Sequence, residues 1–358
     1  MSNIPNTEEL FQKALQMVAP GTKIREAISA IIQSGMGALL CFGEPRKLAQ
    51  LSEGGVELNE EAKPQLIYEL SKMDGAIILN ADGTRILYAN RFLKPNAKIP
   101  SDETGTRHRV AQRMAQQARC IVVAVSQRRS TVTLYVNERK HLLSSVNTLM
   151  NKAMQSLQTI EKFLVSMNSS LQDLTVREFQ EIVTLFDVCK TIQRTQVVLR
   201  LADELKPIIL ELGVEGRLLQ MQIKELLLSI PEAELVIKDY YKERPGFDYN
   251  AVYQKIRELS QLELVDLGNI SQILGYGTNL RAVNEYLVPR GYRVLTMTHR
   301  LPSTLIENLV NKFGNLTQIL HATREELMEV EGIGDVLAER IKSSLNLLRS
   351  QMGLEFRR

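Results

Sequence analysis

Residues 103–111 read ETGTRHRVA, and this stretch decides how the first part of the chain is interpreted. Over residues 110–118 apolar side chains recur at three- and four-residue spacing, which predicts a helix with one apolar face. The first turn of this helix holds a basic triplet, Arg107, His108 and Arg109. The positive end of a helix dipole prefers acidic side chains, so the triplet breaks a local rule. Such exceptions are concentrated at functional sites.

The basic triplet has two interpretations. Two guanidinium groups and an imidazole at a helix N-terminus, where the first N–H groups have no partner inside the helix, form an anion site suited to phosphates. In the other interpretation, Asp102 and Glu103 neutralise the pair of arginines on a solvated surface. Thr104 or Thr106 is the expected N-cap, with Gly105 giving the backbone freedom between them.

Residues 1–140 are predicted to form a mixed α/β domain with a largely central sheet. Short apolar and partly β-branched runs predict strands at 37–43, 75–80, 85–93, 120–126 and 131–137. Helices are expected at about 8–34, 62–72 and 106–119. The pair Asp82-Gly83 and the run QRRS that ends at Ser130 predict tight connections between consecutive strands.

Residues 141–290 change to a helical period and predict an all-α spine. An apolar stripe from Leu143 to Leu164 predicts one long helix. A second helix is expected to start at Thr175, because Thr175 and Glu178 have the spacing of a capping box. Stripes of Leu and Met pack in cores, so no chemistry is assigned to them.

Residues 291–358 are predicted to form a small all-α domain of short helices, after a connector at 286–295 that contains Pro and Gly. Turns are expected at 313–315 and at 331–334. Lys and Arg barely outnumber Asp and Glu in this domain, which is weak support for electrostatic DNA binding.

The glycine-containing turn at 331–334 predicts a second mode of DNA binding, one that does not depend on side-chain charge. Such a turn ahead of a helix presents backbone N–H groups to a phosphate and gives contact that does not depend on base sequence. Ile333 is expected to pack inside the turn. The candidate DNA contacts are Gly332, Ile333, Gly334, Arg340 and Lys342. A purely structural turn is the alternative.

Composition excludes several classes of protein. The chain has 358 residues and a net charge of +3, which is compatible with a polyanionic partner. Cys41, Cys120 and Cys189 lie in apolar runs and are expected to be buried thiols. The sequence has no signal core and no apolar run of membrane-spanning length, so a cytoplasmic protein with no membrane contact is expected. A P-loop and a dinucleotide fingerprint are both missing, which excludes common kinases, ATPases and NAD enzymes.

Asp74 precedes the strand expected at 75–80 and therefore lies at the edge of the sheet, where ligands of α/β domains bind. Gly75 would let a ligand approach the backbone closely. A carboxylate in this place can hold Mg²⁺ or Mn²⁺ against a nucleotide phosphate, or help a sugar hydroxyl to lose its proton. An Asp-Gly pair is also an ordinary turn, and that alternative stays open.

The sequences DGA at 74–76 and GTRHR at 105–109 resemble the two signature motifs of the diadenylate cyclase domain. With the helical spine and the C-terminal hairpins, the whole chain resembles the family of DNA integrity scanning proteins. The resemblance implies that two ATP molecules condense to cyclic di-AMP and two pyrophosphates between facing cyclase domains of an octamer. The C-terminal hairpins also resemble those of Holliday junction proteins, which implies binding of branched DNA coupled to activity.

The resemblance also implies roles for individual residues. Asp74 would bind the divalent ion and help activate the 3′-hydroxyl, while Thr106 and the basic triplet would hold the phosphates. The nucleoside pocket would be lined by Gly75, Ala76 and Leu93, with Ser126 at a nearby strand end. Arg128 and Arg129 would touch a neighbouring subunit or a phosphate, or lie on a solvated turn.

One residue departs from the family pattern. The position after the basic triplet is commonly Thr in this family, and here it is Val110, which keeps the backbone N–H but has no hydroxyl. Loss of that one hydrogen bond would cost on the order of 1 kcal/mol. Val110 is also the feature that favours an alternative function, a DNA-binding scaffold that senses ATP without turnover.

Overall fold

The computed structural model describes residues 7–243, 248–279, 286–298 and 301–352. By internal contacts the chain divides into two units. The first comprises Met1–Gln155 and Glu204–Met221, and the second comprises Ser156–Asp203 and Gln222–Arg358. The first unit therefore includes residues 204–221, which are separated in sequence from the rest of that unit by Ser156–Asp203.

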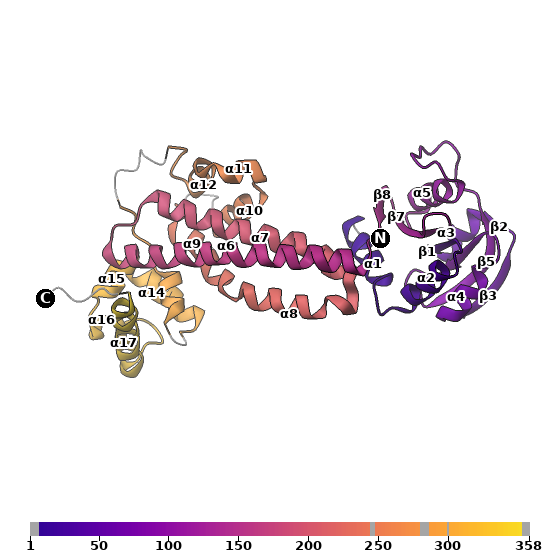
Figure 1. Ribbon diagram of the computed structural model, residues 1–358. Helices are drawn as coiled ribbons and strands as arrows, with labels where there is room; N and C mark the ends of the chain where they lie inside the picture. The colour runs from indigo at the N-terminus through magenta and orange to yellow at the C-terminus, as the bar shows by residue number, and fades with distance from the viewer. Residues whose placement is uncertain (1–6, 244–247, 280–285, 299–300, 353–358) are drawn as a thin grey trace. The chain divides into compact units, whose positions relative to one another are not determined.

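A mixed eight-stranded sheet organises the first unit, as predicted (Figure 1). Its order is β2-β5-β4-β1-β6-β7-β8, with β3 paired to β5, and within the described residues only β1 and β4 run parallel. The strands are β1 (Ala38–Phe42), β2 (Ser52–Glu53), β3 (Val56–Glu61), β4 (Ala76–Leu79), β5 (Arg85–Leu93), β6 (Ile121–Ser126), β7 (Thr131–Val136) and β8 (Arg139–Leu142). The five predicted strands and both predicted hairpins, β4 to β5 and β6 to β7, are confirmed.

The sequence analysis missed β2, β3 and β8. Strand β3 has the sequence VELNEE and its side chains are almost all exposed, so no apolar alternation reveals it. Strand β8 has the sequence RKHL and lies at the end of the sheet order. Edge strands of this kind are marked by charge, since charged side chains prevent unwanted pairing with other chains.

Five helices flank the sheet: α1 (Thr7–Met17), α2 (Lys23–Gln33), α3 (Pro45–Gln50), α4 (Pro64–Leu70) and α5 (Thr106–Ala118). The helical stretch predicted at 8–34 is formed by α1 and α2, which are separated by a turn where Gly21 adopts a left-handed φ of 88°. The Thr22 side chain then caps α2 by accepting a hydrogen bond from the Arg25 N–H over 3.1 Å. The helices predicted at 62–72 and 106–119 are confirmed.

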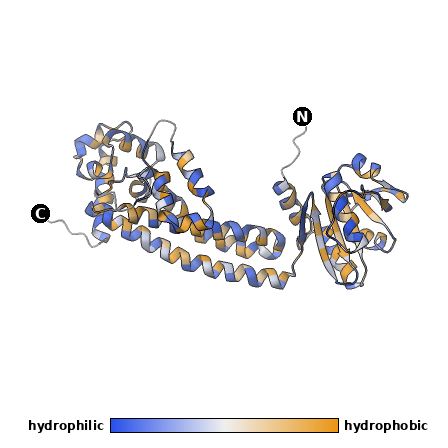
Figure 2. Ribbon diagram, turned by 90° about the horizontal axis from the view of Figure 1, so that it is seen from above, coloured by the Kyte–Doolittle hydropathy of each residue, from blue (hydrophilic) through white to orange (hydrophobic). Residues whose placement is uncertain are grey.

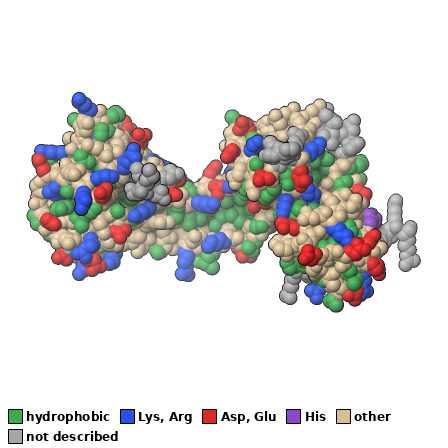
Figure 3. All heavy atoms as spheres, turned by 180° about the vertical axis from the view of Figure 1, so that it is seen from behind, with side chains coloured by type: hydrophobic (Ala, Val, Ile, Leu, Met, Phe, Trp, Pro, Cys, Tyr) green, Lys and Arg blue, Asp and Glu red, His purple; other side chains and the backbone are tan. Residues whose placement is uncertain are grey.

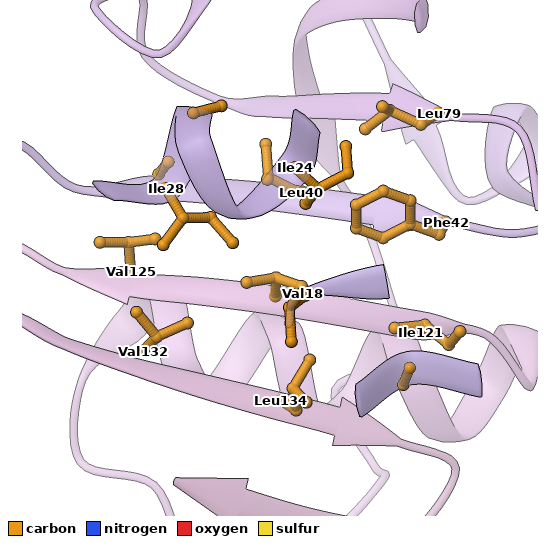
Figure 4. Packing of buried hydrophobic residues seen from close by; sticks show 14 of the residues in the cluster. Val18, Ile24, Ile28, Leu40, Phe42, Leu79, Ile121, Val125, Val132 and Leu134 are labelled. Carbon is orange, nitrogen blue, oxygen red and sulfur yellow. The ribbon is translucent and has the colours of Figure 1, made fainter. Parts of the chain in front are cut away.

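The sheet separates two apolar layers. On one face, side chains of α1 and α2, such as Ile28, pack against alternate residues of the central strands, such as Leu40 and Val125 (Figure 4). On the other face, α5 packs through Ala111, Met114 and Ala115 against the residues in between. Figure 2 shows the hydrophobic colouring of the strands between the helices. Because α5 lies flat on one face, its first turn is held at one edge of the sheet.

The later segment of the first unit is fastened to β8. The buried Glu211 carboxylate accepts a hydrogen bond from the Ser144 N–H over 2.7 Å and contacts the His141 ring nitrogen Nε2 at 2.8 Å. Gly213 lies close to Pro20, where an added side chain would collide with the Pro20 carbonyl at 2.6 Å. The N-terminal part of the chain and residues 204–221 are therefore packed as one body.

The described residues of the region predicted as an all-α spine are mainly helical, apart from the end of β8, the connections between helices and an isolated β-bridge between Val183 and Leu287. Its helices are α6 (Val146–Gln180), α7 (Leu185–Leu212), the short 3₁₀ turns η1 (Gly213–Gly216) and η2 (Leu227–Ser229), α8 (Arg217–Leu226), α9 (Ile230–Tyr240), α10 (Tyr249–Glu258), α11 (Gln261–Val265) and α12 (Leu267–Leu274). The predicted stripe from Leu143 mostly falls on α6, although Leu143 itself precedes the helix.

The prediction that a second helix starts at Thr175 was wrong. Thr175 and Glu178 lie inside α6, where the Thr175 hydroxyl donates to the Leu171 carbonyl over 2.8 Å. The next helix begins at Leu185, after Thr184 and Asp187 exchange hydrogen bonds of 3.0 and 3.3 Å between side chain and backbone. The spacing of a capping box therefore occurs here without a cap, because the Glu178 side chain contacts Tyr240 and Arg293 instead.

Glu178 belongs to a buried cluster within the second unit, together with Asp239, Tyr240 and Arg293. The Tyr240 hydroxyl donates to Glu178 over 2.8 Å, and the Arg293 guanidinium contacts the other oxygen of the same carboxylate. Asp239 accepts three backbone N–H groups at the start of the helix that begins at Tyr292, including that of Arg293 over 3.0 Å. The cluster therefore joins α6 and α9 to the helices that follow.

The C-terminal helices are α13 (Tyr292–Met297), α14 (Ser303–Phe313), α15 (Leu316–His321), α16 (Arg324–Met328) and α17 (Asp335–Gln351). The turns predicted at 313–315 and 331–334 are confirmed, with left-handed φ angles of 79° at Gly314 and 87° at Gly332. The connector predicted at 286–295 ends earlier, because α13 begins at Tyr292 under the cap of Asp239. Among the described residues, no helix has both the length and the apolar character needed to cross a membrane.

Candidate active site

Asp74 and Gly37 lie side by side at one edge of the sheet. Strands β1 and β4 run parallel with Leu40 beside Ile77. Continuing this register backwards places Gly37 next to Asp74, just before the two strands begin. Asp74 is exposed there.

The same edge carries two further candidate residues. Strand β6 runs antiparallel to β1 with Val125 beside Ala38, so Ser126 ends β6 next to Gly37. Strand β5 is antiparallel to β4, and its register brings Leu93 to the level of Asp74. Since the side chains of Leu93 and of Ala76 in β4 pack in the apolar layer under α5, both support the edge from below.

Gly75 gives the edge its shape. Its φ angle of 99° is one that other residues rarely adopt. A side chain added at Gly75 would also meet the Arg91 carbonyl oxygen at 2.9 Å. A glycine is therefore required between Asp74 and β4 for structural reasons, and this requirement is compatible with a ligand above it.

The first turn of α5 starts without a side-chain cap. Gly105 is the N-cap residue, and Thr106 is the first residue of the helix. The prediction of a threonine cap was therefore wrong. Glycine is tolerated at this position and brings no oxygen that could accept from the first N–H groups of the helix.

A cavity of about 610 Å³ opens beside this turn. Basic and hydroxyl-bearing side chains dominate its lining: Thr104, Thr106, Arg107, His108, Ser126, Arg128, Arg129, Thr131, Thr133 and Lys140. Positive charge and hydroxyl donors in one hollow suit a phosphate-bearing ligand. Six candidate residues do not line this cavity, namely Asp74, Gly75, Ala76, Leu93, Arg109 and Val110.

Arg107 extends from α5 to the sheet edge. Its guanidinium lies against Gly37, where any side chain would collide with Arg107 Nη1. Gly37 is thus a site residue that the sequence analysis missed, and its position just before a buried strand is the signal that could have found it. The contact places the Arg107 charge between the levels of Asp74 and Ser126.

Arg109 does not join the other two residues of the basic triplet at the cavity. Its Nε donates to the Glu103 carbonyl over 3.2 Å and its Nη2 to the Thr104 carbonyl over 3.4 Å. Arg109 therefore braces the loop before α5. Val110 packs against the apolar layer beneath the helix, so its side chain serves the core.

The interpretation that Asp102 and Glu103 neutralise the pair of arginines was wrong. Asp102 accepts a hydrogen bond from the Gln112 amide over 2.7 Å, and Glu103 pairs with Lys140 at 2.5 Å. Within the part of the chain that the structure describes, neither carboxylate forms an ion pair with an arginine of the triplet. The guanidinium groups are left to other partners.

Glu103, Lys140, Tyr135 and His108 form a cavity cluster. The Tyr135 hydroxyl donates to Glu103 Oε1 over 2.7 Å, and its oxygen lies 2.9 Å from His108 Nδ1. Sequence analysis missed Tyr135 and Lys140, although the alternation of β7 places Tyr135 on the face covered by α5. Their contacts depend on how β7 and β8 pair, which local sequence does not reveal.

Electrostatics in the cavity cluster favour a charged Glu103 and a neutral His108. Burial lowers the pKa of His108, and the cations Arg107, Lys140 and Arg129 lower it further, against the opposing effect of Glu103. Burial by itself would raise the pKa of Glu103, but hydrogen bonds from Lys140 and Tyr135 outweigh it and lower that pKa. The free protein therefore holds a carboxylate and an uncharged imidazole here near neutral pH.

The candidate DNA contacts lie at the start of α17. Ile333 is buried, as predicted, and its N–H donates to the Val330 carbonyl over 3.0 Å within the turn. Gly334 is the N-cap of this 17-residue helix. Arg340 is exposed and Lys342 half-buried on the following turns. Figure 3 shows basic and acidic side chains interspersed over the face drawn, in keeping with the near balance of charge.

Comparison with known families divides the chain into three matched regions. Residues 25–140 match the family described as DisA bacterial checkpoint controller nucleotide-binding, and residues 143–283 match the corresponding linker region. Residues 303–349 match the helix-hairpin-helix motif. These regions contain, respectively, the cavity, the spine helices and the Gly332 turn.

Curated relatives match over nearly the full length. The DNA integrity scanning protein DisA of Clostridium perfringens (strain SM101 / Type A) is 44% identical over 349 residues, which cover 97% of this chain and 98% of the relative. The protein of the same name from Carboxydothermus hydrogenoformans is 45% identical over 345 residues, covering 96% and 98%. The chain therefore belongs to the family of DNA integrity scanning proteins, diadenylate cyclases in which a helical linker and a helix-hairpin-helix module follow the nucleotide-binding domain.

Proposed function

We propose that this protein condenses two ATP molecules into cyclic di-AMP and releases two pyrophosphates, and that its C-terminal helices bind DNA. The observation that carries the proposal is the convergence of Asp74, Arg107 and Ser126 at one sheet edge beside a basic cavity, in a domain of the cyclase family. The hydroxyl and guanidinium groups of the cavity suit a triphosphate.

The reaction requires two nucleotides that face each other. Each 3′-hydroxyl attacks the α-phosphate of the other ATP, a new P–O bond forms, and the bond to the β-phosphate breaks as pyrophosphate leaves. One domain has one such sheet edge, so two copies of the chain would meet to complete the pair. An octamer is the assembly that we propose, with the helical region as its spine.

Asp74 is the proposed ligand for Mg²⁺ or Mn²⁺. The described residues contain no cluster of three or more His, Cys, Asp or Glu that could hold a metal ion by itself. Magnesium in nucleotide sites takes one or two carboxylates together with substrate phosphates, and Asp74 is an exposed carboxylate suited to this arrangement. When bound, the ion would neutralise phosphate charge and assist ionisation of the 3′-hydroxyl.

The side chains beside the edge have separate proposed roles. Arg107 would hold the triphosphate from the sheet edge, with Thr106 offering its hydroxyl and the first N–H groups of α5. Ser126 would contact the nucleotide from the end of β6. Arg109 would act on the phosphates indirectly, through the loop that it braces, and Val110 would contribute its backbone N–H.

The proposed DNA contact uses the N-terminus of α17. Gly332 lets the chain turn, buried Ile333 anchors the turn, and Gly334 places backbone N–H groups at the start of a long helix. Such contact is independent of base sequence, and branched DNA is the proposed ligand. We further propose that bound DNA changes the rate of cyclic di-AMP formation.

The first test replaces Asp74 with Asn in the full chain, with ATP and Mg²⁺ or Mn²⁺ supplied and products identified by mass spectrometry. We expect cyclic di-AMP from the parent protein and none from Asp74→Asn. Asp82→Asn is the matched control, because Asp82 lies in the hairpin at the opposite end of β4 and should leave activity intact. ATP bound but unconsumed by the parent protein would instead indicate a sensing scaffold.

A further inference from the structure

The cavity cluster fixes the direction of its hydrogen bonds. Glu103 is ionised beside Lys140 at 2.5 Å, so it can only accept. Tyr135 has one hydroxyl proton and donates it to Glu103 over 2.7 Å. The Tyr135 oxygen must therefore accept from His108 Nδ1, which lies 2.9 Å away. The proton of the neutral imidazole is thus on Nδ1.

This assignment leaves Nε2 of His108 as the nitrogen available to a ligand. His108 lines the cavity, and within the described residues its Nε2 has no hydrogen-bond partner. In the neutral ring, Nε2 carries a lone pair and no hydrogen. It would repel a phosphate oxygen, whereas most of the other side chains that line the cavity can donate hydrogen bonds.

Binding of a triphosphate would reverse the electrostatics around the ring. In the free protein, Arg107 in α5, Arg129 in the β6–β7 turn and Lys140 in β8 oppose a charge on His108. The phosphates would neutralise these cations and add negative charge beside Nε2. Glu103, in the loop before α5, would then stabilise the imidazolium through Tyr135 in β7.

We infer that nucleotide binding adds a proton to Nε2 of His108, and that Tyr135 and Glu103 are positioning residues that hold the ring for this step. The proton comes from solvent, no covalent bond forms or breaks, and the imidazolium donates Nε2–H to a phosphate oxygen. This inference rests on the proposed nucleotide site. It assigns work to three groups outside the two signature motifs, namely Glu103, Tyr135 and Lys140.

Isothermal titration calorimetry tests the inference without turnover. The full chain is titrated with 3′-deoxyATP, which lacks the attacking hydroxyl, in excess Mg²⁺ at pH 7.5. Buffers with small and large ionisation enthalpies are compared, because a proton taken up by the complex is released by the buffer. We expect an enthalpy that varies with the buffer by about one proton per site. In His108→Gln this dependence should disappear, and in the matched control His321→Gln it should persist.

Each outcome decides a different point. Measurable binding with no buffer dependence would overturn the inference while leaving the nucleotide site in place. The same buffer dependence in His108→Gln would also overturn it, since another group would then be the acceptor. If the parent protein bound no analogue, the proposed function would fail, and this inference with it.

Tyr135→Phe separates positioning from simple packing, because phenylalanine keeps the buried ring and removes the hydroxyl. Affinity for the analogue should fall about tenfold per pH unit as pH rises between the pKa of His108 in the free protein and its higher pKa in the complex. Tyr135→Phe should move the upper limit of this fall to lower pH. An equal loss of affinity at every pH, with an unmoved profile, would mean that Tyr135 has only a structural role.

Discussion

The cavity cluster and the buried cluster contain the same kinds of group but differ in access to solvent. Tyr135 donates to Glu103 over 2.7 Å at the cavity, and Tyr240 donates to Glu178 over 2.8 Å between the helices of the second unit. Next to the first pair is an imidazole that lines a hollow. Next to the second is Arg293, which is fully buried. Access to a ligand, rather than the residue types, therefore distinguishes a binding site from a buried structural contact between helices.

The largest expected effect is on the buried cluster. Arg293→Met would leave Glu178 and Asp239 buried without their cation, and such losses cost about 3–5 kcal/mol. We expect a lower thermal unfolding transition of the second unit, measured by calorimetry. The control is Arg324→Met, which removes an exposed pair with Asp335 and should lower the transition far less, because solvent screens exposed pairs. Equal decreases of the transition temperature in the two variants would contradict a structural role for the buried cluster.

At the cavity we expect a large loss of activity with little change in stability. Arg107→Ala should lower the rate of cyclic di-AMP formation by about 100- to 1000-fold, as for removal of one preorganised charge that stabilises a transition state. Because Arg107 faces the cavity, thermal stability should stay close to that of the parent protein. Arg109→Ala, which frees the loop but removes no cavity charge, should lower the rate less. A larger loss for Arg109→Ala would contradict this assignment.

The smallest expected effect is a pH dependence of stability. Burial raises the pKa of Glu178 to about 7 against the opposing effect of Arg293, so the folded protein binds this proton more tightly than the unfolded chain, whose pKa is near 4.5. Stability is then highest below about pH 4.5 for this group and is lost as pH rises to about 7. Burial raises the pKa of Asp239 as well, which adds in the same direction.

Calorimetry of the parent protein and Glu178→Gln between pH 5 and 8 checks this dependence. The thermal midpoint of the second unit should fall with rising pH in the parent protein and change less in the variant. If the midpoint rose with pH in the parent protein and rose equally in Glu178→Gln, ionisation of the Glu178 carboxyl group would not destabilise the folded protein.

Much of the fold was predictable because burial leaves a local pattern. The strands β4, β6 and β7 are apolar runs, and the glycine turns before α15 and α17 are visible in the sequence. Strand β3 has no apolar pattern, since nearly all its side chains meet solvent. Thr175 and Glu178 have capping spacing, but Glu178 is held by the distant Arg293.

The candidate site was predictable in the same partial way. Asp74 and the basic triplet stand next to strand and helix starts, which a sequence displays. The role of Gly37 depends on the register of β1 with β4 and on the reach of Arg107. The ring of Tyr135 meets His108 only after β7 is placed beneath α5. The contacts of Gly37 and Tyr135 could not be predicted, because they depend on how the strands pair across the sheet.

The attachment of Glu211 to β8 has a consequence for how the protein is made. A chain that leaves the ribosome from its N-terminus exposes the whole sheet well before residues 204–221 appear. Until then, His141 and the Ser144 N–H lack the carboxylate that they contact in the finished unit. The nucleotide-binding domain is thus completed late in translation, after the long helix α6 and most of α7 have been synthesised.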